Sequence, residues 1–186
     1  MNYKLEDESL VQIINERNTT RLVNLIDPTK VAYGGTYDVK SRFIEPTLMT
    51  GVDWSDKVMQ EEIFGPILPI MTYSGIEDVV ATIKDKAKPL ALYLFTQDAA
   101  LKAKVLSEVS FGGGCVNETI MHIANGALPF GGVGDSGTGN YHGQAGFRAF
   151  SHFKSILDRE LVADPAIKYS PHTAEKLAML RSVTGQ

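Results

Sequence analysis

The sequence has one cysteine, one tryptophan, no surplus of basic residues and no long apolar run. A single thiol, Cys115, cannot form a disulfide within the chain, which fits a reducing compartment such as the cytoplasm. The formal net charge of -4 leaves no excess of Lys and Arg to neutralise phosphates, so nucleic acid is not an expected partner. The longest nearly uncharged apolar run, residues 67–76, is far shorter than the roughly 20 residues of a membrane span. The acidic, polar N-terminus does not have the pattern of a secretory signal.

The hydrophobic residues that are present follow helical and strand periodicities over most of the chain. With 186 residues, 44% hydrophobic and 22% charged, the composition is that of a soluble globular protein, and the length fits one domain or one and a half. The patterns predict helices at 8–26, 76–86, 99–109 and 173–183, and extended segments at 30–33, 42–49, 67–73, 90–96 and 111–117.

The order of these elements predicts an α/β fold. From residue 67 the elements alternate strand, helix, strand, helix, strand, which implies parallel crossovers with helices covering the sheet. Asp98 is placed to cap the third helix. The two earlier extended segments are expected at a sheet edge, because Pro46 lacks the N–H that a central strand needs. A fold of this kind usually opens on a strand, so the opening helix indicates a chain that continues a domain begun upstream.

A glycine-rich stretch, residues 125–146, indicates a loop that needs positive φ angles or close backbone approach. Within it, residues 132–137 match the Gly-x-Gly-x-x-Gly spacing of dinucleotide sites. That match is weak, because the fingerprint requires a buried strand leading into the glycines and Pro129 interrupts the short segment before them.

Residues 61–66, Glu-Glu-Ile-Phe-Gly-Pro, place two carboxylates and an aromatic side chain before an apolar strand. A carboxylate there could accept hydrogen bonds from a sugar diol, while Phe64 offers a flat apolar face to a ring. The alternative is a helix end with solvated glutamates and a core phenylalanine.

Cys115 and the four histidines are the candidate catalytic or metal-binding groups. No Lys, Arg or His is adjacent to Cys115 in sequence, so a buried, inert thiol is favoured over a nucleophile. The histidines are not spaced as zinc ligands and have no cysteine partners, so no metal site is expected. These histidines are His122, His142, His152 and His172.

Three motifs, taken in order, resemble aldehyde dehydrogenases. They are residues 61–66, residues 89–95 (Pro-Leu-Ala-Leu-Tyr-Leu-Phe) and residues 128–137 (Leu-Pro-Phe-Gly-Gly-Val-Gly-Asp-Ser-Gly). The shorter runs Ile-Ile-Asn-Glu-Arg at 13–17, Ile-Met-His at 120–122, Tyr-His-Gly at 141–143 and Phe-Ser-His at 150–152 are similar to the class 3 branch of that family. The resemblance extends from Val11 to about Leu157.

The resemblance implies roles for five residues. Glu62 matches the glutamate that binds the nicotinamide ribose hydroxyls, and Phe64 matches the aromatic beside the nicotinamide. Phe130 and His142 match positions that line the aldehyde pocket, and Asn117 lies in the loop before the substrate mouth. The family oxidises an aldehyde to an acid by attack of a cysteine thiolate, hydride transfer from the thiohemiacetal to NAD or NADP, and hydrolysis assisted by a glutamate.

No catalytic residue is expected in this chain. In the family the nucleophile lies in a Gly-Gln-x-Cys motif upstream of the 13–17 run, and Cys115 falls at a later position. The general base and the Rossmann half are likewise upstream. Residues 1–150 are therefore expected to be the C-terminal portion of the catalytic domain, with a parallel or mixed sheet flanked by helices. Residues 151–186 are expected to hold an oligomerisation strand and a tail helix.

Two hypotheses follow from the resemblance. The first is that the chain is part of an NAD(P)-dependent, cytoplasmic aldehyde dehydrogenase and is inactive alone. The second is a non-catalytic interaction module, in which residues 153–161 pair with the sheet edge of a partner subunit and so form a homodimer.

Overall fold

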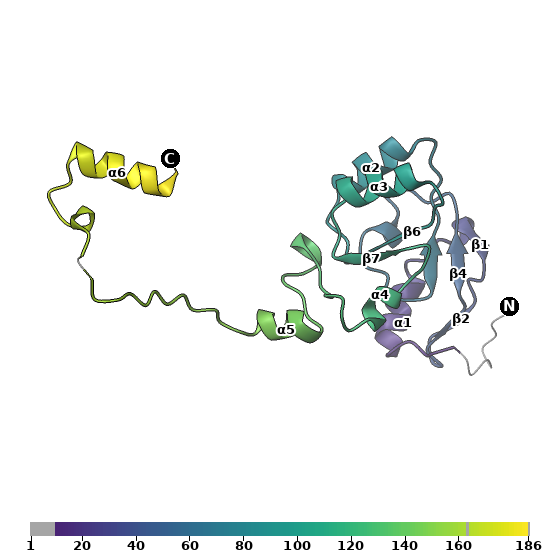
Figure 1. The fold of residues 1–186 in the computed structure, drawn as a ribbon. Coiled ribbons are helices and arrows are strands. Elements are labelled where there is room, and N and C mark those ends of the chain that lie inside the picture. The colour runs from purple at the N-terminus through teal and green to yellow at the C-terminus, as the bar shows by residue number, and fades with distance from the viewer. Residues whose placement is uncertain (1–9, 163, 186) are drawn as a thin grey trace.

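The structure is a computed structural model that describes residues 10–162 and 164–185 (Figure 1). The acidic N-terminal segment and the first two residues of the predicted opening helix lie outside the described residues. The helices are α1 (Glu16–Val23), α2 (Ile76–Lys84), α3 (Ala99–Glu108), α4 (Met121–Ala124), α5 (Gly143–Ala149) and α6 (Ala174–Thr184), with 3₁₀ turns η1 (Pro28–Lys30), η2 (Lys57–Met59), η3 (Gly134–Ser136) and η4 (Ala166–Lys168). The strands are β1 (Val31–Tyr33), β2 (Tyr37–Asp38), β3 (Phe43–Ile44), β4 (Thr47–Met49), β5 (Ile67–Pro69), β6 (Ala91–Leu94) and β7 (Gly113–Val116).

The first half of the chain forms a mixed three-stranded sheet in the order β1-β4-β5. β1 is antiparallel to β4 and β4 is parallel to β5, while β2 and β3 form a separate antiparallel pair. Leu22 of helix α1 and Leu25, which follows the helix, pack into a core that includes Met49 of β4 and Ile67 of β5. This core fixes the start of β5, where the 61–66 motif ends.

The expected edge position of the second extended segment is wrong for its last part. β4 is the central strand of its sheet, with hydrogen-bonded neighbours on both sides. Pro46 lies just before the strand, so its missing N–H falls outside the ladder. The first residue of the strand, Thr47, donates its N–H to the Pro66 carbonyl at 2.8 Å.

The opening helix is shorter than its apolar pattern predicts. The Asn15 side chain accepts a hydrogen bond from the Asn18 N–H at 2.8 Å, so α1 begins at Glu16. The residues before it do not extend the helix, because the Ile13 N–H donates to the Arg42 carbonyl at 2.9 Å instead of to a helical carbonyl. A local cap and a long-range backbone bond therefore override the periodicity before Asn15.

The second half confirms the predicted strand-helix-strand crossover. β6 and β7 pair in parallel, from Ala91 opposite Gly113 to Leu94 opposite Val116. Helices α2 and α3 lie side by side over this pair (Figure 1) and bury Val80 and Val105 beside strand residues of β6. The Asp98 side chain caps α3 as predicted. The pairing differs from a single continuous sheet, because β5 and β6 belong to different sheets.

Past α5 the chain runs away from this α/β body toward α6 (Figure 1). Residues 151–160 form neither helix nor strand. The segment expected to be an oligomerisation strand is exposed, with Leu157 at 91% and Leu161 at 106% of full exposure. A strand needs a partner edge, and no strand of the described residues pairs with this segment. Among the described residues, no helix combines the length and apolar character needed to cross a membrane.

The tail has its own polar cluster, which predicts a response to acid. The Asp164 carboxylate accepts hydrogen bonds from Lys168 Nζ and Arg159 Nη1, each at 2.8 Å, and from the Tyr169 hydroxyl. These donors, Lys168 first, hold the pKa of Asp164 well below its ordinary value. Stabilisation from a carboxylate with a lowered pKa is complete above the ordinary Asp value of about 3.9, and it is lost as the pH falls below that value.

We expect the Tyr169 ring resonances to stay unchanged until the pH is well below the ordinary Asp value of about 3.9, because protonation of Asp164 in the folded chain follows its lowered pKa. Asp164→Asn should produce the low-pH spectrum already at neutral pH, and Glu160→Gln serves as the control. A neutral-pH spectrum of Asp164→Asn identical to that of the wild type would refute the role of this cluster.

Candidate functional site

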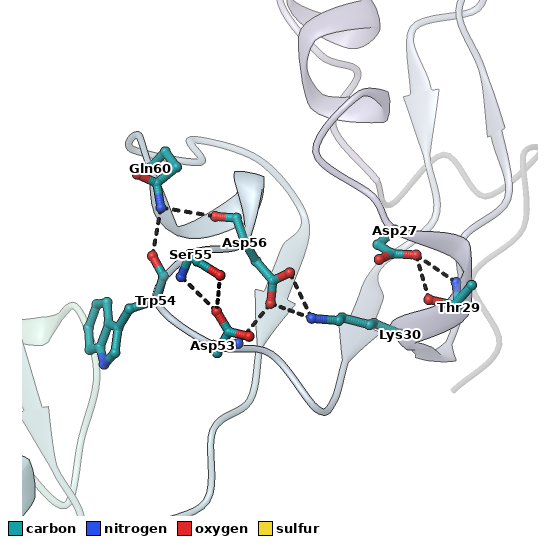
Figure 2. A network of polar contacts seen from close by, with 8 residues as sticks. All are labelled: Asp27, Thr29, Lys30, Asp53, Trp54, Ser55, Asp56 and Gln60. Carbon is teal, nitrogen blue, oxygen red and sulfur yellow. Dashed lines mark hydrogen bonds and ion pairs between the residues drawn. The ribbon is translucent and has the colours of Figure 1, made fainter.

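Residues 61–66 are called the 61–66 loop below. The turn that precedes this loop is fixed by a polar network (Figure 2). Lys30 Nζ contacts both Asp56 carboxylate oxygens at 2.6 and 2.7 Å, and Asp56 also accepts the Asp53 N–H. Gln60 donates through Nε2 to the Trp54 carbonyl at 2.6 Å. The hydrogen bond to Asp56 raises the pKa of Lys30 above its ordinary value. The loop therefore departs from a defined position beside β1.

The carboxylates around this network are held in the charged form by nearby hydroxyl groups. The Ser55 hydroxyl is the main cause of the lowered pKa of Asp53, and the Thr29 hydroxyl has the same effect on the pKa of Asp27. Both aspartates lie in short turns that flank the Lys30–Asp56 ion pair (Figure 2).

Glu62 and Phe64 both face outward from the 61–66 loop. Phe64 is 84% exposed, which excludes the alternative of a core phenylalanine. The Glu62 carboxylate is exposed and accepts no hydrogen bond from any residue that the structure describes. The backbone of Phe64 has a φ of 48°, a strained value for a bulky residue. An apolar ring and an unpaired carboxylate thus lie two residues apart on one short loop.

The structure brings Phe130 and His142 together, as their predicted shared pocket requires. Their rings stack with centroids 5.7 Å apart and an interplanar angle of 20°. Phe130 exchanges two backbone hydrogen bonds of 2.8 Å with Tyr141, forming an isolated antiparallel bridge. The His142 φ of 88° turns the chain into α5 beside that bridge. This bridge closes the glycine-rich loop at its base.

The Asn117 side chain, just after β7, forms hydrogen bonds to the backbone of Thr96. Its Oδ1 accepts the Thr96 N–H at 2.8 Å and its Nδ2 donates to the Thr96 carbonyl at 2.9 Å. The residue has a φ of 58°. The amide therefore ties the carboxyl ends of β6 and β7 together, the edge at which parallel α/β sheets bind ligands.

The expectation of a buried Cys115 thiol is wrong, and a histidine distant in sequence lies beside it in space. The thiol is half-buried, and its Sγ lies 3.5 Å from His122 Nδ1. His122 is only 7% exposed, and its Nε2 has no hydrogen-bond partner in the described part of the chain. Its ring also contacts Tyr93 and Phe130, with centroids 5.8 and 6.1 Å away. His122 therefore extends the aromatic cluster around Phe130 toward Cys115.

The glycine-rich loop does not form a dinucleotide cradle. Residues 134–136 of the Gly-x-Gly-x-x-Gly match form the 3₁₀ turn η3, and the next helix, α5, begins only at Gly143. The glycines serve close backbone approach instead: a Cβ on Gly132 would lie 2.1 Å from the Ser136 carbonyl oxygen. Among the described residues, no three His, Cys, Asp or Glu side chains are grouped so as to hold a metal ion.

The sequence analysis assigned no role in the site to two of its neighbours. One is His122, which reaches Cys115 because α4 turns back on β7 after Ile120, a residue with a φ of 63°. The other is Arg21 of α1, which binds the 61–66 loop across about forty residues of sequence. An arginine on a predicted helix face has the appearance of an ordinary solvated residue.

The sequence and the fold are both similar to those of known proteins. The model of the aldehyde dehydrogenase family matches residues 9–156. The chain belongs to the aldehyde dehydrogenase family. It is 46% identical over 157 residues to a bovine protein named "aldehyde dehydrogenase, dimeric NADP-preferring", covering 84% of this chain and 66% of that one.

The class 3 branch indicated by the short motifs is confirmed. The Arabidopsis thaliana "aldehyde dehydrogenase family 3 member H1" is 42% identical over 183 residues, which cover 96% of this chain and 38% of the relative. The solved substrate-bound state of Staphylococcus aureus AldH superimposes with a TM-score of 0.82 at 41% identity, covering 93% of this chain and 38% of the other. This aldehyde dehydrogenase chain thus spans between about a third and two thirds of the length of these relatives.

Proposed function

We propose that this chain forms the C-terminal portion of an NAD(P)-dependent enzyme that oxidises aldehydes to carboxylic acids. In this proposal residues 1–150 belong to the catalytic domain and residues 151–186 form the oligomerisation strand and tail of a homodimer. The observation that carries the proposal is the outward display of Glu62 and Phe64 on one strained loop. A half-exposed single thiol suits a reducing cytoplasm, where we place the protein.

The chemistry of the 61–66 loop fits a nicotinamide riboside. The Glu62 carboxylate has two acceptor oxygens without partners in the described chain, and a ribose diol supplies two donors. The exposed Phe64 ring offers a flat face to the nicotinamide. When bound, NAD(P) accepts a hydride from the substrate. The residues of this chain would orient the sugar and the ring, because the adenosine and pyrophosphate contacts belong to the upstream half.

The 61–66 loop forms one side of the proposed site, and the aromatic rings around Phe130 form the other. The stacked rings of Phe130 and His142 present an apolar surface with one polar edge, which fits an aldehyde with an apolar body. Asn117 would keep the neighbouring strand ends in place through its two bonds to Thr96. Under this proposal no residue of the chain carries out the covalent step, since Cys115 lies beside His122 at the end of β7 rather than in the family's nucleophile motif.

The alternative proposal is a non-catalytic interaction module. It is favoured by the exposed apolar side chains between α5 and α6, which offer an extended segment for pairing with another chain. The two proposals predict different behaviour toward nicotinamide nucleotides, because an interaction module has no reason to bind them.

A titration with reduced nicotinamide mononucleotide, followed by NMR, tests the proposed function. We expect weak binding, with a Kd on the order of 1 mM, because this chain is proposed to supply only a small part of the protein surface that contacts the cofactor. Resonances of the 61–66 loop should shift, and Glu62→Gln and Phe64→Ala should each weaken binding by roughly tenfold. Glu118→Gln, another exposed glutamate, is the matched control. Binding that is unaffected by both substitutions, or no binding at all, would favour the interaction module.

A further inference from the structure

The Arg21 side chain of α1 reaches the loop that displays Glu62 and Phe64. Nη1 donates to Glu61 Oε1 at 2.8 Å and to the Glu62 carbonyl at 3.3 Å, while Nη2 donates to the Ile63 carbonyl at 2.7 Å. The Arg21 side chain is 30% exposed, so these bonds are partly shielded from water. One guanidinium group thus holds a carboxylate and two successive backbone carbonyls just before Phe64.

The other side of Phe64 is also fixed by α1. A Cβ on Gly65 would lie 2.6 and 2.7 Å from the two Cδ atoms of Leu22, a side chain with no exposed surface. Phe64 lies between these two contacts with its φ of 48°. A backbone value of this kind costs free energy and persists only when the surrounding structure imposes it. Arg21 on one side and Leu22 on the other provide that constraint.

We propose that Arg21 is a positioning residue for the 61–66 loop, which it holds in the conformation that turns Glu62 and Phe64 outward. The inference rests on the proposed function, because in that function this loop conformation places Glu62 and Phe64 where they can bind the nicotinamide riboside. Arg21 donates to the backbone and to Glu61, not to the Glu62 carboxylate. A planar guanidinium can bond two carbonyls and a carboxylate at once, whereas a lysine ammonium cannot span the same three acceptors.

The test uses the full 186-residue chain and a small set of variants. Arg21→Met removes all three hydrogen bonds. Arg21→Lys keeps the positive charge but lacks the two guanidinium nitrogens that bond the three acceptors. Glu61→Gln removes only the charge of the ion pair. Arg17→Met, an exposed arginine of the same helix, is the matched control. Thermal unfolding of each variant establishes that it is folded under the conditions of the measurement.

Two readouts separate positioning from general stability. Backbone ¹⁵N relaxation should give order parameters near 0.85 for residues 62–65 in the wild type and below about 0.6 in Arg21→Met. Affinity for reduced nicotinamide mononucleotide should fall by roughly tenfold in Arg21→Met, only slightly in Glu61→Gln, and not at all in Arg17→Met. In Arg21→Ala, added methylguanidinium should restore part of the affinity, and methylammonium should not.

The outcomes distinguish this inference from the proposed function. If Arg21→Met keeps an ordered loop and unchanged affinity while Glu62→Gln loses affinity, the positioning role is overturned and the proposed function stands. If the wild type binds no nicotinamide nucleotide, the proposed function fails, and the relaxation data alone then decide whether Arg21 orders the loop.

Discussion

Replacing Leu22 with alanine should lower the free energy of unfolding by about 2–5 kcal/mol, the range for a fully buried leucine. Leu22 has no exposed surface and lies in the core that joins α1 to the mixed sheet. Its Cδ atoms also pack against Gly65, so the substitution leaves a cavity directly beneath the 61–66 loop. A loss of this size is a large part of the roughly 5–15 kcal/mol that stabilises a typical domain.

Urea unfolding monitored by circular dichroism measures this effect. Leu106→Ala is the matched control, because Leu106 is also on a helix but is 45% exposed. We expect the control to change stability by less than about 1 kcal/mol. A cost for Leu22→Ala no greater than that of the control would mean that α1 does not pack on the sheet as described.

Replacing Phe153, Leu157 and Leu161 together with serine should weaken self-association of the chain by at least about tenfold. In an extended segment alternate side chains point to the same face, so these three share one apolar face. All three are exposed, at 73%, 91% and 106%. A face of this kind, on a segment with unpaired backbone groups, favours association with another chain.

Sedimentation equilibrium over a range of concentrations measures that association. The matched control replaces three exposed apolar residues of α6, Leu177, Leu180 and Val183, with serine. We expect the control to associate like the wild type. A monomeric wild type, or a control that loses association equally, would contradict the assignment of residues 153–161 as the oligomerisation strand.

The second half of the α/β body could be predicted from the sequence because its signals are local. The periodicity of β6, α3 and β7 and the cap at Asp98 each depend on a few neighbouring residues, and the structure has all of them. A parallel pair joined by a helix follows from that order. The extent of the sheet did not follow, because pairing between β5 and β6 depends on packing that no local pattern specifies.

The first half shows how long-range bonds override local patterns. The apolar periodicity before Asn15 predicts a longer helix, but the Ile13 N–H is bonded to Arg42, which lies far along the sequence. Pro46 predicts an edge, but its position just outside β4 leaves the central ladder complete. Both predictions were wrong, because the bond partner of Ile13 and the exact start of β4 at Thr47 are set by tertiary contacts that no local pattern shows.

The site residues were found through motifs, whereas the contacts that organise them were not. Phe64 and His142 have positive φ angles, which a sequence indicates only where glycine or asparagine is present. The pairing of Cys115 with His122 depends on the turn at Ile120, and the Arg21 contacts depend on how α1 lies against the loop. These features require the three-dimensional structure.

An aldehyde oxidation assay on the purified 186-residue chain tests the proposed function most directly. Aliphatic and aromatic aldehydes are incubated with NAD or NADP, and the carboxylic acid product is measured by mass spectrometry. Under the proposed function we expect no acid above the protein-free blank, because Cys115 does not lie in the nucleophile motif that the resemblance implies. Acid formation that Cys115→Ser abolishes would contradict it, since Cys115 is the only thiol in the chain and it lies beside His122.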